Sequence, residues 1–217
     1  MELTLYDFGL EAFIQLMVRT GHTDERIKER IDELVHLNRW DEKKEKEEEV
    51  DEEDELFMLK GDKEERAALV HKELTSFRAK YEEEMLTWGE VTDNDRLDAA
   101  FAQFNKEGIL SSQNCGKTLS DGHYQLTQAA KKAYKRRKIV YEGICFYHEQ
   151  DLNNAVFCGQ LALRWAMSEE TPSESTATAF VMKLLRILKD NGVSASWNNN
   201  LNASLHVTLK WRQRPNK

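Results

Sequence analysis

The chain has 217 residues, of which 40% are hydrophobic and 32% charged, and its formal net charge is −8. This length allows one large domain or two small ones, and the composition supports a buried core. The apolar runs are far shorter than the roughly 20 residues that a membrane-spanning helix needs, and no basic region precedes an apolar one at the amino terminus. We therefore expect neither a membrane segment nor a signal peptide.

The three cysteines, Cys115, Cys145 and Cys158, lie far apart in the sequence and form no Cys-x-x-Cys pair. A zinc site built from these residues is disfavoured by their spacing. Cys145 lies in an apolar run and is expected in the core. We expect reduced thiols, a cytoplasmic protein, and neither a bound metal nor a cofactor.

Charge is distributed unevenly along the chain. Residues 1–90 hold 27 acidic and 14 basic side chains, a net charge of −13, whereas residues 91–217 hold 12 acidic and 17 basic side chains, a net charge of +5. Such an imbalance predicts two regions with different surroundings. We divide the chain into an acidic helical region, 1–90, and a second domain, 91–217.

The first region has the apolar periodicity of helices. Ile27, Ile31, Leu34 and Val35 recur at i, i+4, i+7 and i+8, which predicts one amphipathic helix. A second, longer helix is predicted by an apolar stripe at i, i+4, i+7 and i+11, formed by Val70, Leu74, Phe77 and Tyr81.

Between these helices, residues 41–55 hold eleven acidic and three basic side chains, and Val50 is the segment's one apolar residue. So little apolar area is available for burial that we expect a solvent-exposed helix or loop. The alternative is an acidic patch that imitates nucleic acid or docks on a basic partner.

The second region begins with a helix, a short strand and a second helix. Thr92 is a candidate cap with Asp95 three residues later, and the strand begins at Ile109. The second helix starts near Ser120 and ends in residues 131–138, of which six are basic. These cations either complement the helix dipole or contact phosphate. Because the chain as a whole is acidic, we expect weak or absent nucleic-acid binding.

From residue 138 on, strands alternate with helices. Residues 139–147 form an apolar and β-branched run that predicts a buried strand, and a short helix follows. Alternation predicts strands at 161–167 and 204–211, and a further strand is predicted at 193–197. Thr171 is predicted to cap a helix with Pro172 at its first position. We predict an α+β protein: a helical amino-terminal region followed by a small α/β layer with a mixed four-stranded sheet in the order β-α-β-α-β-β.

Polar residues gather where these elements begin and end, and we expect three such clusters to converge. His148, Gln150 and Asp151 follow the buried strand, at the edge of a sheet where ligands commonly bind. The second cluster lies in the turn and helix start at 114–122, and the third at the helix start 92–97. The candidate binding residues are Asp93, Arg96, Asn114, Ser120, Asp121, His148, Gln150 and Asp151. The alternative is that these residues only cap helices.

Three of these segments together resemble an uncharacterised bacterial domain family of unknown function. The family carries the motifs Thr-Asp-x-Asp-Arg-Leu-x-x-Ala-Phe, Thr-x-Ser-Asp-Gly and Phe-Tyr-His-x-Gln-Asp, which occur here in order at 92–101, 118–122 and 146–151. The resemblance covers roughly residues 85–214. This chain departs from the family at 157–161, where Phe-Cys-Gly-Gln-Leu replaces the usual Gly-Gly-Gly-Leu segment. The resemblance implies no activity.

Two functional classes are open. Because no established catalytic motif is present, the chain is predicted to be a non-catalytic cytoplasmic binding protein that acts on a protein partner, as a regulator or an immunity-type inhibitor. The alternative is an enzyme of unknown reaction that uses His148 as general base, oriented by Asp151 or Asp121. A deep pocket holding His148, Asp121 and Asp93 would favour the enzyme, and an open surface the binding protein.

Overall fold

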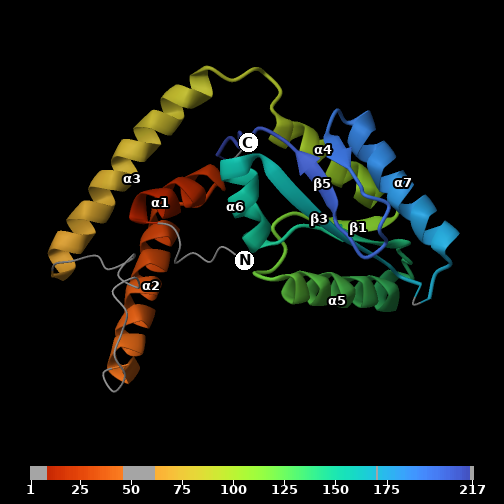
Figure 1. Cartoon of the computed structure of the whole chain (residues 1–217), viewed down its shortest axis with the longest axis horizontal. Coiled ribbons are helices and arrows are strands. Elements are labelled where there is room, and N and C mark those ends of the chain that lie inside the picture. Colours follow the sequence, from red (N-terminus) through yellow and green to blue (C-terminus); the bar gives the residue numbers. More distant parts are fainter. Residues whose placement is uncertain (1–8, 46–61, 170, 216–217) are drawn as a thin grey trace. The chain divides into compact units, whose positions relative to one another are not determined.

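The structure is a computed structural model that describes residues 9–45, 62–169 and 171–215. It divides into two compact units (Figure 1). The first comprises the described residues up to Trp88 together with those from Gln213 on, and the second comprises Gly89–Arg212. Within the described residues, no helix is long and apolar enough to cross a membrane.

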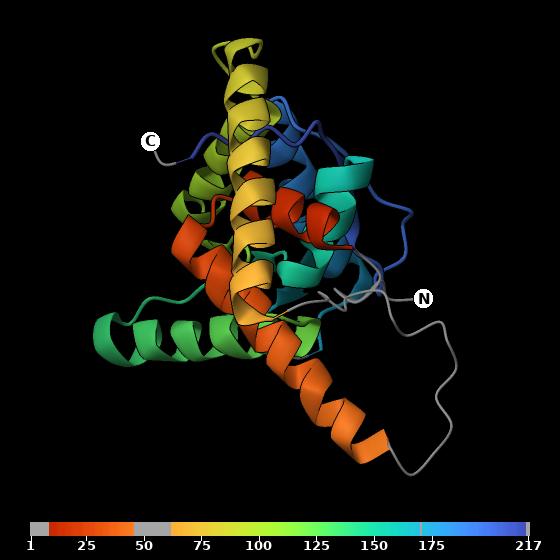
Figure 2. The ribbon, with the colours of Figure 1, turned by 90° about the vertical axis from the view of Figure 1, so that its left-hand side faces the viewer.

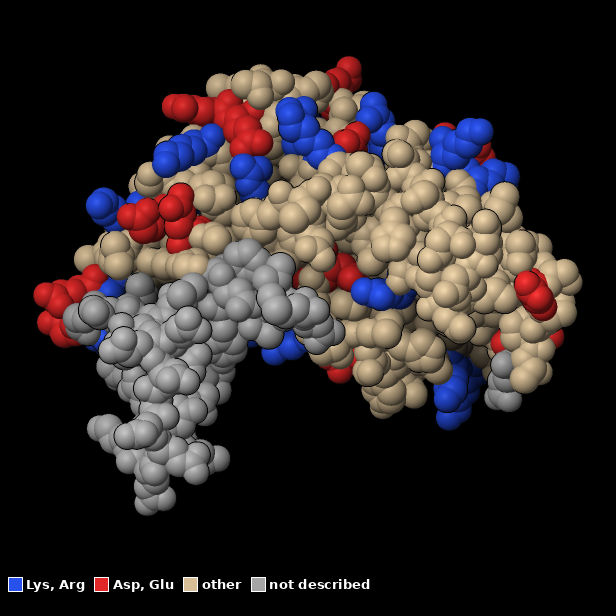
Figure 3. Space-filling view, in the orientation of Figure 1, with Lys and Arg blue, Asp and Glu red and all other residues tan. Residues whose placement is uncertain are grey.

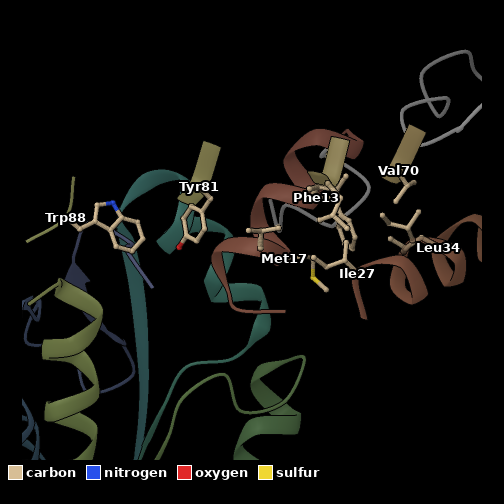
Figure 4. Close-up of a cluster of buried hydrophobic side chains, with 11 residues drawn as sticks. Phe13, Met17, Ile27, Leu34, Val70, Tyr81 and Trp88 are labelled. Carbon is tan, nitrogen blue, oxygen red and sulfur yellow. The ribbon is translucent and has the colours of Figure 1, made fainter. Parts of the chain in front are cut away.

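The first unit consists of three helices, α1 (Leu10–Arg19), α2 (Asp24–Glu45) and α3 (Lys63–Leu86). Figure 2 shows α3 crossing over α1 and α2. The predicted apolar stripes meet here in one core (Figure 4), which includes Phe13, Met17, Ile27, Leu34, Val70, Tyr81 and Trp88. The chain returns to this core at its carboxyl end, since the hydroxyl of Tyr81 donates a hydrogen bond to the carbonyl oxygen of Gln213 at 2.7 Å.

The acidic segment 41–55 is described only in part. Helix α2 continues through Glu45, so the segment begins as helix. Residues 46–55 lie outside the described residues, and the predicted exposure of the segment stays a prediction.

The second unit is built on a five-stranded sheet in the order β1-β2-β3-β5-β4. Its strands are β1 (Ile109–Ser112), β2 (Gly143–Phe146), β3 (Gln160–Met167), β4 (Ser194–Ser196) and β5 (Leu205–Thr208). Strands β1 and β2 are parallel, and the other neighbours are antiparallel. The helices are α4 (Asp93–Lys106), α5 (Leu119–Arg137), α6 (Glu149–Cys158) and α7 (Glu174–Asp190).

Helices cover both faces of this sheet (Figure 1). Ile144 and Phe146 of β2 pack with Leu126 of α5 on one face. The alternate residue Gly143 faces α7, because a Cβ atom at this position would meet the ring of Phe180. Burial on both faces explains why β2 is an unbroken apolar run and not an alternating one.

The predicted α+β class is confirmed, but the sheet has five strands and not four. The additional strand is β1, which was expected to belong to a separate helix-strand-helix unit. It instead pairs in parallel with β2, in a register that places Ile109 opposite Gly143. Parallel pairing connects segments that are distant in sequence, so local patterns do not reveal it.

Three predicted boundaries are wrong, and one of them is the end of the last strand, which was expected at residue 211 and lies at Thr208. Strand β2 begins at Gly143 and not near Ile139, because α5 ends at Lys138 in a left-handed conformation and Ile139 and Val140 are exposed. Helix α7 begins at Glu174 and is capped by Ser173, whose hydroxyl accepts a hydrogen bond from the N–H of Thr176 at 3.1 Å. The predicted cap, Thr171, lies before the helix.

Candidate functional site

His148 and Asp151 lie where β2 ends and α6 begins. The backbone N–H of His148 donates to Oδ2 of Asp151 at 3.1 Å, and Nε2 of the imidazole lies 3.3 Å from the same oxygen. Both side chains are buried, with exposed fractions of 5% and 6%. The carboxylate of Asp151 therefore caps α6 from its third position and also faces the imidazole.

Arg164 of β3 supplies the positive charge beside this carboxylate. Its Nη2 donates to Oδ1 of Asp151 at 2.8 Å, and its Nη1 donates to Oγ of Ser204 at 2.9 Å. The sheet register places Arg164 opposite Phe146, near the end of β2. Because a buried carboxylate is costly unless it is paired, Arg164 is the residue that allows Asp151 to lie here. We call His148, Asp151, Arg164 and Ser204 the Asp151 network.

The start of α5 adjoins the start of α6 through the backbone. The N–H of Glu149 donates to the carbonyl oxygen of Gly116 at 3.1 Å. The N–H of Cys115 donates to the carbonyl oxygen of Tyr147 at 2.8 Å. Gly116 also lies against Asp121, whose Cβ would be 2.7 Å from a Cβ placed on the glycine. Two of the three predicted clusters, at 114–122 and 146–151, are therefore neighbours.

The carboxylate of Asp121 caps α5. It accepts a hydrogen bond from the N–H of Thr118 at 3.2 Å, and the Thr118 hydroxyl in turn accepts one from the N–H of Asp121 at 3.3 Å. Ser120 and Asp121 are both exposed, as are Asn114 in the preceding turn and Gln150 in the first turn of α6.

The third cluster, at the start of α4, is bound to the segment that follows β5. Oδ1 of Asp93 accepts from Nη1 of Arg96 at 2.7 Å, while Oδ2 accepts from the backbone N–H of Lys210 at 2.9 Å. Oδ1 of Asn94 accepts from the N–H of Arg212 at 2.6 Å. Arg96 thus pairs within its own helical turn, and Arg164 is the arginine beside Asp151.

A small pocket of about 100 Å³ lies beside Asp93. Its remaining walls come from α4 and from strands β4 and β5 with the residues that flank them, and they are Leu97, Gly192, Val193, Ser194, Val207, Thr208 and Leu209. Neither His148 nor Asp121 is among these residues. The pocket is therefore not the shared cleft that an active site built from all three clusters would need.

Buried groups next to the Asp151 network are held in their neutral forms. Burial raises the pKa of the Cys145 thiol and of the Tyr147 phenol well above their ordinary values. The hydroxyl of Tyr147 donates to Oε1 of Gln113 at 3.2 Å. Cys145 is fully buried, as predicted, and its protonated thiol is unsuited to nucleophilic attack.

Sequence reasoning missed Arg164, Ser204 and Asn94. A signal for Arg164 was present, because alternation along β3 places it on the opposite face from Leu161 and Leu163, as a single arginine within a mostly apolar strand. Ser204 and Asn94 carried no such signal, because their partners are 40 and 118 residues away.

No cluster of three or more histidine, cysteine, aspartate or glutamate side chains that could hold a metal ion occurs in the part of the chain that the structure describes. The groups that the site offers are hydrogen-bond donors and acceptors and one partly buried ion pair.

A family described as Domain of unknown function (DUF6891) matches residues 7–215. The chain belongs to this family. The DUF6891 match extends well beyond the motifs at 92–151 and includes the helical first unit, so the family is defined by both units. No curated protein and no solved structure matches the chain.

Proposed function

We propose that the chain is a non-catalytic binding protein that acts on a protein partner. The observation that carries this proposal is the use of the candidate catalytic carboxylates. Asp121 caps α5, Asp93 binds the Lys210 backbone and Arg96, and Asp151 binds the His148 backbone and Arg164. Each carboxylate already has a structural role, so none is available as a separate acid or base.

The burial of His148 also supports this proposal. A general base must come within hydrogen-bond distance of the proton that it removes. The His148 side chain is only 5% exposed and is held between the end of β2 and the start of α6.

A surface for a protein partner is available on α5. Half of the large apolar side chains that the structure records as exposed lie in or directly after this helix; they are Leu119, Tyr124, Tyr134, Ile139 and Val140. Tyr124 and Val140 are 65% and 73% exposed. Exposed apolar side chains that are grouped, and not scattered, are typical of protein-binding surfaces. We call the exposed side chains from Tyr124 to Val140 the α5 surface.

The second candidate is an enzyme in which His148 is the general base and Asp151 orients it. The distance of 3.3 Å between Nε2 and Oδ2 favours this candidate, since such a pair is the usual arrangement of a base and its orienting carboxylate. Asp121, the other predicted orienting residue, is engaged with Thr118.

One affinity-purification experiment separates the two candidates. The tagged chain and its variants are expressed in the native host, and bound proteins and small molecules are identified by mass spectrometry. We expect one protein to bind to the wild type and to His148→Ala but not to the double variant Tyr124→Ser/Val140→Ser. The matched control is Met182→Ser on α7, another exposed apolar residue, which should retain the protein. If His148→Ala folds normally but loses a bound small molecule or a newly detected activity, the enzyme is favoured.

A further inference from the structure

We propose that the α5 surface binds an acidic segment of the partner protein. This inference rests on the proposed function and specifies the chemistry of the partner. It starts from the six cations near the end of α5, which are Lys131, Lys132, Lys135, Arg136, Arg137 and Lys138. All six are exposed.

These cations lack anionic partners in the described part of the chain. The contact of Lys138 is with a ring, since its Nζ lies 5.1 Å from the centre of Tyr134. Among the described residues, no carboxylate forms an ion pair with the other five cations. The sequence explains this, because residues 122–141 contain no aspartate or glutamate. All charged side chains of this stretch are therefore basic, although the net charge of the chain is negative.

Several cations elsewhere in the molecule are paired. Arg19 binds Glu84 at 2.6 Å, Arg164 binds Asp151 at 2.8 Å, and Lys183 binds Glu142 at 2.6 Å. Over α3, acidic and basic side chains alternate, whereas blue side chains project from the lower edge of the view near the end of α5 (Figure 3). The α5 surface differs from these paired sites, because its six neighbouring cations have no anionic partner in the described part of the chain.

The helix dipole accounts for only some of these cations. Its effect is confined to the last turn, which holds Lys135, Arg136 and Arg137. Lys131 and Lys132 lie further from the end. They also form like-charge i, i+4 pairs with Lys135 and Arg136, an arrangement that destabilises a helix unless an anion lies nearby. An acidic partner would remove this repulsion.

The second half of α5 extends beyond the core. Leu126 is its last buried residue, and none of the following eleven helical residues is buried. Tyr124, Lys131 and Lys135 share the face opposite Leu126, at i, i+7 and i+11. A polar helix end that neither packs on the core nor forms i, i+4 ion pairs gains little stability from its own chain. Contacts with a partner would stabilise this half of α5.

Apolar side chains next to the cations favour an acidic protein over nucleic acid. Ile139 and Val140 are exposed directly after the basic turn, and aliphatic side chains of this kind form the centre of protein interfaces. Phosphate contacts need only donors and cations. An acidic segment that also carries apolar residues matches both components of the α5 surface.

The test is a selection of random 16-residue peptides, displayed on phage, against the full chain. Selected peptides should be rich in Asp and Glu and contain apolar residues. Their affinity, measured by fluorescence anisotropy, should fall about tenfold between 50 and 200 mM salt. The variant Lys131→Glu/Lys135→Glu should lose at least about tenfold in affinity. The control Lys72→Glu/Lys80→Glu on α3 makes the same change in net charge at exposed lysines and should bind as the wild type does. Circular dichroism should show that both variants are folded.

Different failures are distinguishable. Selected peptides that bind α5 without acidic enrichment, or that are insensitive to Lys131→Glu/Lys135→Glu, would overturn the acidic partner and leave the proposed function standing. Tighter binding of a 20-base-pair DNA duplex than of any peptide would also overturn it, as would self-association of the chain through these lysines. If no peptide is selected and the wild type captures no protein from its host, the inference and the proposed function both fail.

Discussion

Arg164 and Asp151 form a partly buried ion pair 13 residues apart in sequence, in which Nη2 donates to Oδ1 at 2.8 Å. The other carboxylate oxygen accepts from the backbone N–H of His148. The pair thus connects the central strand β3 to the start of α6. A carboxylate that is 6% exposed depends on this guanidinium for its charge compensation.

Arg164→Met should therefore lower the free energy of unfolding by about 3 kcal/mol, because it leaves Asp151 buried without its cation. The measurement is urea unfolding followed by circular dichroism. The double variant Arg164→Met/Asp151→Asn should recover part of the loss. Arg186→Met is the control, because Arg186 is half exposed and its ion pairs are solvated, and its effect should be much smaller. Equal losses of stability in Arg164→Met and Arg186→Met would contradict the role of Arg164 in compensating the charge of Asp151.

Thr92→Ala should destabilise the second unit by about 1 to 2 kcal/mol. The Thr92 hydroxyl accepts from the N–H of Asp95 and donates to its carboxylate, and the residue is 5% exposed. Thr92→Ser keeps the hydroxyl and should retain most of the stability. Thr118→Ala removes the corresponding cap of α5, where the capping hydrogen bonds are exposed, and thermal unfolding should show a smaller loss. A larger loss of stability in Thr118→Ala than in Thr92→Ala would show that burial does not strengthen the cap at Thr92.

Gly122→Ala should cost about 2 to 3 kcal/mol, or prevent folding of the second unit. A Cβ atom at this position would overlap the carbonyl oxygen of Cys115 and the ring of Phe146. Phe146 lies in β2, and the N–H of Cys115 donates to the carbonyl oxygen of Tyr147, so neither can move away easily. The neighbouring variant Ser120→Ala lies on the exposed side and should change stability by less than about 0.5 kcal/mol. Comparison of the two melting temperatures tests the close packing of α5 on β2. Normal stability of Gly122→Ala would show that α5 does not approach the sheet this closely.

Stability of the first unit should fall between pH 10 and pH 12. Burial raises the pKa of Tyr81 from its ordinary value near 10 to about 12, although the Arg19 charge opposes the shift. Above pH 10 the unfolded chain releases the phenolic proton while the folded chain keeps it, so unfolding becomes more favourable as the pH rises. The loss should reach about 2 to 3 kcal/mol near pH 12.

Tyr81→Phe is the control for this pH dependence, because it keeps the ring and removes the titrating group. The variant should lose about 1 kcal/mol at neutral pH through the missing hydrogen bond to Gln213. The difference in stability between wild type and variant should shrink and then reverse as the pH rises. A difference that stays constant up to pH 12 would contradict the raised pKa.

The sequence determined the features that depend on neighbouring residues. The amphipathic stripes, the cap at Thr92, the helix start after β2 and the α+β order all arise from interactions within a few residues. Periodicity and capping chemistry report such interactions directly. The organisation of the chain into a helical part and a sheet part followed from the same local patterns.

Tertiary structure alone decided which distant residues meet. It paired β1 with β2, placed Arg164 and not Arg96 beside Asp151, and bound Asn94 to the backbone of Arg212 across 118 residues. It also left the second half of α5 uncovered, although its composition resembles that of many helices with basic ends. Sheet pairing and ion pairing across such distances are selected by the packing of the whole unit, and local sequence carries little information about it.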